Sequence, residues 1–321
     1  MRVIFGLIVF LNIVIFSSPL FSKNYVLIIA GQSNANGRPP IDTISVLKES
    51  KKPLIGLRFD VRNHFYNRTK VWVDPNDSIR LSWGGYMPPV PGYTPSENPG
   101  WEPLNVNYNQ FYQCGYWTAD DNTTHASHGL EVEFAYAFET DPVHKDDELY
   151  IIKWAYGGIS LAQNPKDIDW YPFSDHKMYY YFVNNFLFPA FSSRELSNYE
   201  PLGFWWSQGE SDSMILENAE AYGENLENFF SILHSDVPQM KFFKNYIQQC
   251  ETGSRIGGKY AEIVRQKQAE FCAISYNNCT VLNIDHLDFM AQNNDQTFVH
   301  LSSLGFKELS DILYPMMSTI N

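Results

Sequence analysis

One serine stands in a sequence context that favours nucleophilic chemistry. Ser33 lies in the stretch Gly31-Gln32-Ser33-Asn34, directly after an apolar run at 25–30 that is typical of a core strand. A serine at a tight strand-to-helix turn presents its hydroxyl at the mouth of a sheet, with backbone N–H groups beside it, as acyl transfer requires. The structural alternative for the same residues is a Ser/Asn helix cap.

A glycine pair follows a second apolar run. Gly157 and Gly158 come shortly after the run at 149–153. Without a Cβ, such residues let backbone amides approach the negative oxygen that develops during acyl transfer. A glycine pair also occurs in many ordinary loops, so it gains weight only beside the other residues.

A third apolar run, at 202–206, leads into an amide side chain and two carboxylates, those of Gln208, Glu210 and Asp212. An acidic helix N-terminus accounts for Asp212 but accounts poorly for Gln208. We therefore expect this strand end to contribute to the same site.

A serine nucleophile needs a base, and His300 is the candidate because it directly precedes an amphipathic stretch at 303–316. A loop that leads into the final helix can return to the carboxyl edge of a sheet. We interpret the other histidines as structural or solvated.

The elements that position these residues alternate along the chain as strands and helices. This alternation predicts a doubly wound, mostly parallel α/β sheet whose ligands bind at the carboxyl ends of the strands. Expected strands lie at 25–30, 149–153, 202–206, 242–247 and 281–284, and expected helices at 130–139, 179–191, 215–233, 260–273 and 303–316.

A long segment, about 39–127, interrupts this alternation. It is dense in Pro, Gly, Asn and aromatic residues, so we expect an irregular insertion with a few short strands. Aromatic residues make up 16% of the chain, and those in the insertion form a candidate sugar-binding rim. These rings are Trp72, Trp83, Tyr86, Tyr93, Trp101, Tyr108 and Trp117.

Together the motifs resemble those of the SGNH-hydrolase superfamily, and specifically of the sialate O-acetylesterase-like domain, which includes the acetylxylan esterases of carbohydrate esterase family 6. The resemblance rests on blocks that occur in the family's order and span essentially the whole chain after residue 25. These blocks are Gly31-Gln32-Ser33-Asn34, Gly157-Gly158, Trp206-Ser207-Gln208-Gly209-Glu210-Ser211-Asp212 and Val299-His300-Leu301-Ser302.

The resemblance implies a flavodoxin-like, three-layer α/β/α sandwich with a mostly parallel five-stranded sheet. It also implies hydrolysis of an ester, typically an acetyl group on a sugar hydroxyl, with no metal or organic cofactor. Ser33 would be the nucleophile and His300 the general base. The oxyanion hole would use Ser33, Gly157, Gly158 and Gln208, and we expect Gln32 and Asn34 to contact the substrate.

The sequence leaves more than one candidate for the acid of the catalytic triad. The superfamily commonly places an Asp three residues before the His, where this chain has Thr297, and a threonine cannot stabilise an imidazolium by charge. Glu210 or, alternatively, Asp295 would supply the carboxylate. A third alternative is a weak enzyme or a glycan-binding protein on an esterase scaffold.

Composition and the N-terminal residues indicate which partners and which cellular compartment to expect. A net charge of -13 argues against a nucleic-acid partner and slightly against an acidic substrate, although Arg38 or Lys153 could contact one. Residues 1–22, with Arg2 before an apolar run, have the layout of a secretory signal peptide rather than a stable membrane anchor. Cys114, Cys250, Cys272 and Cys279 allow up to two disulfides in an oxidising compartment.

The sequence therefore predicts one esterase domain at 23–321, secreted or periplasmic after cleavage, acting on an acetylated polysaccharide or oligosaccharide through an acetyl-enzyme on Ser33. Two alternatives remain: a non-catalytic glycan-binding protein, and a lipid or thioester hydrolase of the same superfamily.

Overall fold

The structure is a computed structural model that describes residues 22–37, 66–73, 99–104, 116–118, 124–126, 128–165, 168–174, 177–251, 258–290 and 300–318. The expected signal peptide, apart from its last residue, lies outside this part of the chain. In the described part, no helix is both long enough and apolar enough to cross a membrane.

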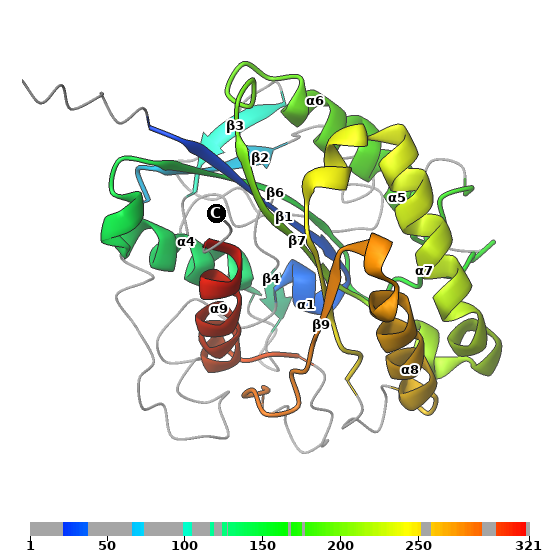
Figure 1. Cartoon of the computed structure of the whole chain (residues 1–321). Helices are drawn as coiled ribbons and strands as arrows, with labels where there is room; N and C mark the ends of the chain where they lie inside the picture. The colour runs from blue at the N-terminus through cyan, green and yellow to red at the C-terminus, as the bar shows by residue number, and fades with distance from the viewer. Residues whose placement is uncertain are drawn as a thin grey trace, which may run out of the picture.

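A central sheet of seven strands organises the molecule, with the spatial order β3-β2-β6-β1-β7-β8-β9 (Figure 1). Neighbouring strands are parallel except for β2 and β3, which are antiparallel. The strands are β1 (Asn24–Gly31), β2 (Thr69–Val73), β3 (Gly100–Pro103), β6 (Glu148–Ala155), β7 (Glu200–Ser207), β8 (Asn245–Gln248) and β9 (Cys279–Leu282).

The five expected strands are all present, and their order in space is second, first, third, fourth, fifth. That is the flavodoxin-like order, whose ligand site lies where the winding reverses, here between β1 and β7. The expected count of five strands is too low, because β2 and β3 extend the sheet from within the insertion. The β-branched run Thr69–Val73 forms β2 and pairs with β6. It was not assigned as a sheet strand from sequence because the residues around it are rich in Pro and Gly.

Helices cover both faces of the sheet, with α4 and α9 on one face and α5, α6, α7 and α8 on the other (Figure 1). A short hairpin of β4 (Tyr116–Thr118) and β5 (Thr124–Ala126) lies apart from the sheet. The helices are α1 (Ser33–Asn36), α4 (Leu130–Thr140), α5 (Met178–Tyr181), the π-helical segment η3 (Phe182–Leu187), α6 (Phe188–Phe191), α7 (Leu216–Asp236), α8 (Ala261–Ala273) and α9 (Ser303–Ser318). The 3₁₀ turns are η2 (Pro142–His144), η4 (Asp212–Met214), η5 (Pro238–Phe242) and η6 (Ser275–Asn277).

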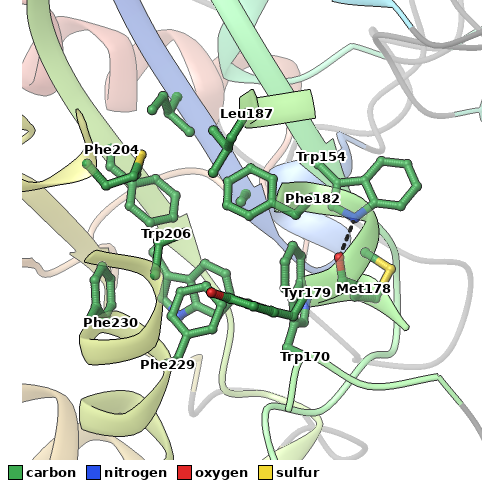
Figure 2. Close-up of a cluster of buried hydrophobic side chains, with 14 of the residues drawn as sticks. Trp154, Trp170, Met178, Tyr179, Phe182, Leu187, Phe204, Trp206, Phe229 and Phe230 are labelled. Carbon is green, nitrogen blue, oxygen red and sulfur yellow. Dashed lines mark hydrogen bonds between the residues drawn. The ribbon is translucent and has the colours of Figure 1, made fainter. Parts of the chain in front are cut away.

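Two apolar cores, one on each face, explain why the strands are almost continuously hydrophobic. Along β1, Val26 and Ile28 enter the core beneath α5–α8, while Leu27 and Ile29 enter the core beneath α4 and α9. The first core is rich in large rings, which Figure 2 shows packed against one another. Trp170 and Trp206 meet edge to face with ring centroids 5.0 Å apart.

The expected aromatic rim is wrong for the two rings whose side chains the structure describes. Trp72 is buried and donates from its indole nitrogen to the carbonyl of Asn185 at 2.9 Å. Trp101 packs edge to face on Trp72 and donates to Ser193 Oγ at 2.9 Å. Both sit in sheet strands, so they belong to the packing. The side chains of the other five rings lie outside the described part.

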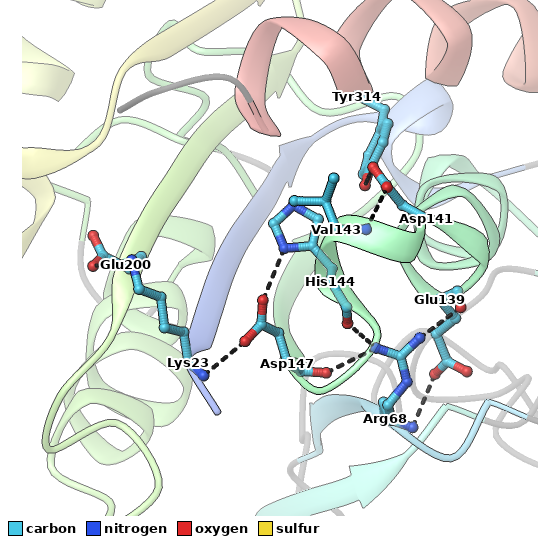
Figure 3. A network of polar contacts seen from close by, with 9 residues as sticks. All are labelled: Lys23, Arg68, Glu139, Asp141, Val143, His144, Asp147, Glu200 and Tyr314. Carbon is cyan, nitrogen blue, oxygen red and sulfur yellow. Dashed lines mark hydrogen bonds and ion pairs between the residues drawn. The ribbon is translucent and has the colours of Figure 1, made fainter. Parts of the chain in front are cut away.

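A polar network secures the amino ends of the strands, at the opposite edge from the candidate site (Figure 3). The backbone amide of Lys23 donates to Asp147 at 2.9 Å, and His144 contacts the other oxygen of that carboxylate at 3.0 Å. Arg68 donates to the carbonyls of Glu139 and Asp147. The network joins the starts of β1, β2 and β6 to the end of α4.

One disulfide, Cys272–Cys279, joins the end of α8 to the start of β9. Cys250 is a buried free thiol, and Cys114 lies outside the described residues.

Candidate active site

The turn that carries Ser33 is built by close contact between the ends of β1 and β7. Gly31 has a φ of 136°, and a Cβ there would lie 2.0 Å from the carbonyl oxygen of Ser207. The amide of Gln32 donates to that same oxygen at 2.8 Å. Only glycine fits this approach, and the chain turns directly into α1 with Ser33 as its first residue.

The Gly31 carbonyl fixes the turn from the other side. It accepts from the Trp170 indole at 3.1 Å and from the Tyr156 amide at 3.3 Å. Ser33 is 7% exposed, so little more than its edge reaches the surface. Within the described part of the chain its backbone amide donates to no acceptor, which leaves that N–H available to a substrate oxygen.

The glycine pair occupies the loop after β6, beside the turn. Gly158 is exposed with a φ of 78°, and a Cβ there would meet nothing within 4 Å. No acceptor for the amide of Gly157 or Gly158 lies among the described residues. The loop therefore offers backbone donors at an open surface, as an oxyanion hole needs.

Asp212 holds this loop in place. Its buried carboxylate accepts from the amide of Leu161 at 2.8 Å and from that of Ala162 at 2.9 Å, and it also accepts from Gln208 Nε2 at 2.6 Å. Burial raises the pKa of Asp212 to about 6, while the three hydrogen bonds oppose that rise. From sequence, an acidic helix N-terminus accounted for Asp212, but the structure shows that its carboxylate joins the end of β7 to the glycine loop.

The Gln208 side chain is part of the same buried network. Besides the bond to Asp212, its Nε2 donates to the Ile159 carbonyl at 3.1 Å and lies 3.5 Å from Gln32 Oε1. To donate to a substrate oxyanion, Gln208 has to exchange one of these partners, so its predicted role stays a prediction. Gln32 is also buried, and its Oε1 faces the Ser211 amide at 3.4 Å, so its described contacts are internal.

Asn34 brings the His300 segment to the serine turn. Asn34 Oδ1 accepts from the Leu301 amide at 2.9 Å, and its side-chain amide also hydrogen-bonds the Glu210 carboxylate. His300 is half-buried, and its carbonyl accepts from the Met290 amide at 2.8 Å. The neighbours of both predicted catalytic residues are thus in direct contact. Asn34 itself is buried, which fits a positioning role better than a substrate contact.

The segment that follows β9 hydrogen-bonds the backbone at His300 and just after it. Ser302 Oγ donates to Asp288 Oδ2 at 2.5 Å, and the Ser302 amide donates to the Asp288 carbonyl at 3.1 Å. A two-residue bridge between Phe289 and Leu301 continues the pairing. This backbone pairing defines where His300 stands before α9 begins.

Glu210 is a buried carboxyl among other acids. Burial raises its pKa to about 7, and the charges of Glu251 and Asp212 add to the rise, while the bond from Asn34 opposes it. Its Oε2 has no hydrogen-bond partner in the part of the chain that the structure describes. Asp295 and Thr297, on which the competing assignment depends, lie outside the described residues.

A buried ion pair supports α1. Lys153 Nζ lies 2.8 Å from Glu131 Oε2 and donates to the Asn36 carbonyl at 2.8 Å, with both charged side chains inaccessible. Lys153 is therefore not placed to contact an acidic substrate, contrary to the sequence-based expectation, and Arg38 lies outside the described residues. The sequence alone did not pair Glu131 with Lys153, which lie 22 residues apart on α4 and β6.

Among the described residues, no three His, Cys, Asp or Glu side chains are grouped so that they could hold a metal ion.

Comparison with known proteins gives the family. A family profile described as "Carbohydrate esterase, sialic acid-specific acetylesterase" matches residues 99–318. Among solved structures, NanS superposes with a TM-score of 0.59 at 13% identity, covering 93% of this chain and 98% of its own. A protein from Arabidopsis thaliana superposes with a TM-score of 0.53 at 19% identity, covering 93% and 99%.

At these identities the two structures support the fold alone, and a comparison with curated protein sequences found no match. The profile, however, covers well over half of the chain, including Gly157, Gly158, Gln208 and His300. The chain therefore belongs to the sialic acid-specific acetylesterase family of carbohydrate esterases and is a carboxylic ester hydrolase.

Proposed function

We propose that this protein removes acetyl groups from an O-acetylated carbohydrate through an acetyl-enzyme on Ser33. The observation that carries the proposal is the hydrogen bond between Asn34 and Leu301, which joins the serine turn to the histidine segment at the edge where the glycine loop also ends. The described geometry thus gathers a hydroxyl, a base-bearing segment and unpaired backbone donors at the β1/β7 switch point.

The reaction follows from these groups. His300 takes the proton from Ser33 Oγ as that oxygen attacks the acetyl carbonyl carbon. The amides of Ser33, Gly157 and Gly158 hold the oxyanion, joined by Gln208 once it exchanges an internal partner. When the intermediate collapses, the bond from the carbonyl carbon to the sugar oxygen breaks and His300 protonates the leaving hydroxyl. A water molecule, deprotonated by His300, then releases acetate from the serine.

In this proposal Glu210 supplies the carboxylate that stabilises the His300 imidazolium, and Asp295 is the alternative. Asn34 supports the assignment because it hydrogen-bonds both the Glu210 carboxylate and the Leu301 amide, next to His300. Activity should then fall as the pH drops through about 7, since the carboxylate form of Glu210 is the active one. Glu210→Gln and Asp295→Asn separate the two assignments, because the variant that loses the triad acid should lose up to about 10⁴-fold in kcat.

The assay measures release of p-nitrophenol from p-nitrophenyl acetate and of acetate from acetylated xylan. Ser33→Ala and His300→Ala should each lose at least about 10³-fold in kcat. The exposed residues Ser275 and His286 provide matched controls, Ser275→Ala and His286→Ala, which should keep wild-type rates. Wild-type rates in the Ser33 and His300 variants would show that the mechanism is wrong.

The acyl group is tested with the same enzyme. If the protein is an acetylesterase, kcat/KM should fall steadily from p-nitrophenyl acetate to the butyrate and octanoate esters. If it is a lipid hydrolase, kcat/KM should rise along the same series. Hydrolysis of acyl thioesters tests whether it is a thioester hydrolase. Export is also part of the proposal, because Arg2 and the apolar run that follows it have the layout of a signal peptide. N-terminal sequencing of the protein recovered from the medium or periplasm should begin near residue 23.

A further inference from the structure

A shallow groove outside the catalytic edge gathers exposed aromatic rings. It has a volume of about 530 Å³ and lies along α5, η3 and α6, closed on one side by residues 172–174 and on another by the end of α7. Five large aromatic side chains are exposed in the described part of the chain, and three of them line this one groove. They are Phe173 at 64%, Tyr180 at 42% and Phe188 at 42% exposure.

The helical winding places two of these rings, Tyr180 and Phe188, in a row with Asn184 between them. Residues 182–187 form a π-helical turn, a rare feature that is frequent at functional sites. Tyr180, Asn184 and Phe188, four residues apart, are all exposed, while Tyr179 and Phe182 point into the core, where Figure 2 shows them. The row spans roughly 12 Å, at about 1.5 Å per residue, which suits a short run of sugar units.

Polar groups stand between the rings. The side-chain nitrogen of Asn184 donates a hydrogen bond to the Tyr180 carbonyl at 2.8 Å, so the side-chain oxygen of Asn184 points away from that bond. The exposed Asp236 lines the far wall and accepts from the Tyr179 hydroxyl at 2.8 Å. Flat apolar rings with hydrogen-bonding groups between them match the two faces of a sugar ring, whose C–H bonds stack on π-systems while its hydroxyls need polar partners.

The charge of the groove selects among sugars. No Lys, Arg or His lines the groove in the part of the chain that the structure describes, and Asp236 carries its one carboxylate. Among the described residues of the groove, a sugar acid would meet like charge with no cation beside it, so an uncharged glycan chain fits this lining best.

One end of the groove is close in sequence to a residue that holds the serine turn. Phe173 is three residues from Trp170, whose indole holds the Gly31 carbonyl beside Ser33, and three residues reach at most about 11 Å. We propose that this groove binds the backbone of a neutral polysaccharide or oligosaccharide and so retains the acetylated substrate near Ser33. This inference rests on the proposed function, since it names the class of carbohydrate that the site serves.

Affinity electrophoresis of the full chain through gels with soluble deacetylated xylan, glucomannan or galactan tests the groove apart from catalysis. At least one neutral polymer should retard the wild-type protein, and polygalacturonate should not. Tyr180→Ala and Phe188→Ala should each weaken retardation about three- to tenfold, the range for one aromatic contact. Tyr276→Ala, which removes a ring that is 77% exposed in η6, is the matched control and should migrate as wild type does.

Kinetics separate this proposal from the esterase assignment. The groove variants should keep wild-type kcat/KM on p-nitrophenyl acetate and show a three- to tenfold higher KM on the acetylated form of the retained polymer. If no neutral polymer retards the wild type, or if the groove variants behave as Tyr276→Ala does, the groove proposal is wrong. An inactive protein that is still retarded through Tyr180 and Phe188 would instead overturn the catalytic proposal and leave the groove standing.

Discussion

The buried carboxyl of Glu210 should make the stability of the fold depend on pH in a defined direction. In the folded protein its pKa is raised from 4.5 to about 7, chiefly by burial. Below pH 4.5 the residue is protonated in both the folded and the unfolded chain. Between 4.5 and about 7 the unfolded chain releases its proton while the folded chain retains it, so the free energy of unfolding falls as pH rises.

The magnitude follows from the shift. At about 1.36 kcal/mol per pH unit, the rise in pKa corresponds to about 3 kcal/mol of stability lost by pH 7.5. Glu210→Gln removes the titration but keeps an oxygen for Asn34. The variant should match the wild type near pH 4 and exceed it by about 3 kcal/mol at pH 7.5. The difference between the two curves includes the interaction of Glu210 with Asp212, whose charge adds to the rise in the Glu210 pKa.

Urea unfolding followed by tryptophan fluorescence, from pH 4 to pH 8, measures this difference. Glu270→Gln is the matched control on an exposed helix face, where a hydrogen bond from Lys267 lowers the pKa of Glu270. Its difference from the wild type should not grow with pH in the same sense. A constant offset between the Glu210→Gln and wild-type curves, or a variant that is less stable at pH 7.5, would refute the reasoning.

Three further changes test the supports of the site. In Asp212→Asn, the side-chain NH₂ faces one of the two backbone N–H groups that the carboxylate accepts from, so the glycine loop loses a support. This variant should lower kcat on p-nitrophenyl acetate about 10²–10³-fold, and an unchanged kcat would show that Asp212 does not position the loop. Lys153→Met should cost about 3–5 kcal/mol in urea unfolding, with partial recovery when Glu131→Gln is added; no recovery would mean that the pair is not coupled. Gly31→Ala forces a Cβ against the Ser207 carbonyl and should lower kcat/KM at least about 10²-fold, so wild-type activity in this variant would disprove the turn geometry.

Most of the fold could be predicted from the sequence, because a strand that is covered on both faces appears as a continuous run of apolar residues. The runs behind β1, β6 and β7 are apolar at nearly every position, and the predicted helices match the observed ones within a few residues. Strand β8 begins at Asn245, later than expected, because Pro238 opens a 3₁₀ turn in the residues before it.

The candidate site was predictable where its residues follow strands, and was not where partners are distant in sequence. Ser33 and the glycine pair could be placed from their position after apolar runs. The Asp212 carboxylate binds an amide 51 residues away, and Asn34 binds the Leu301 amide 267 residues away. No local pattern encodes such contacts, because the topology of the sheet creates them.

The aromatic residues show a second limit. Composition cannot distinguish a ring that packs in a core from one that faces a ligand. Trp72 and Trp101 looked like a sugar-binding rim because of their irregular surroundings, but they pack on the sheet. The exposed rings Tyr180 and Phe188 belong to a segment that sequence analysis treated as an ordinary helix.

Covalent labelling tests the central claim most directly. The wild-type protein is incubated with a fluorophosphonate and its intact mass is measured, followed by peptide mapping. The proposed mechanism predicts one adduct per chain, mapped to Ser33, that is absent from Ser33→Ala and strongly slowed in His300→Ala. A wild-type protein that acquires no adduct, or an adduct that persists in Ser33→Ala, would contradict the assignment of Ser33 as the nucleophile.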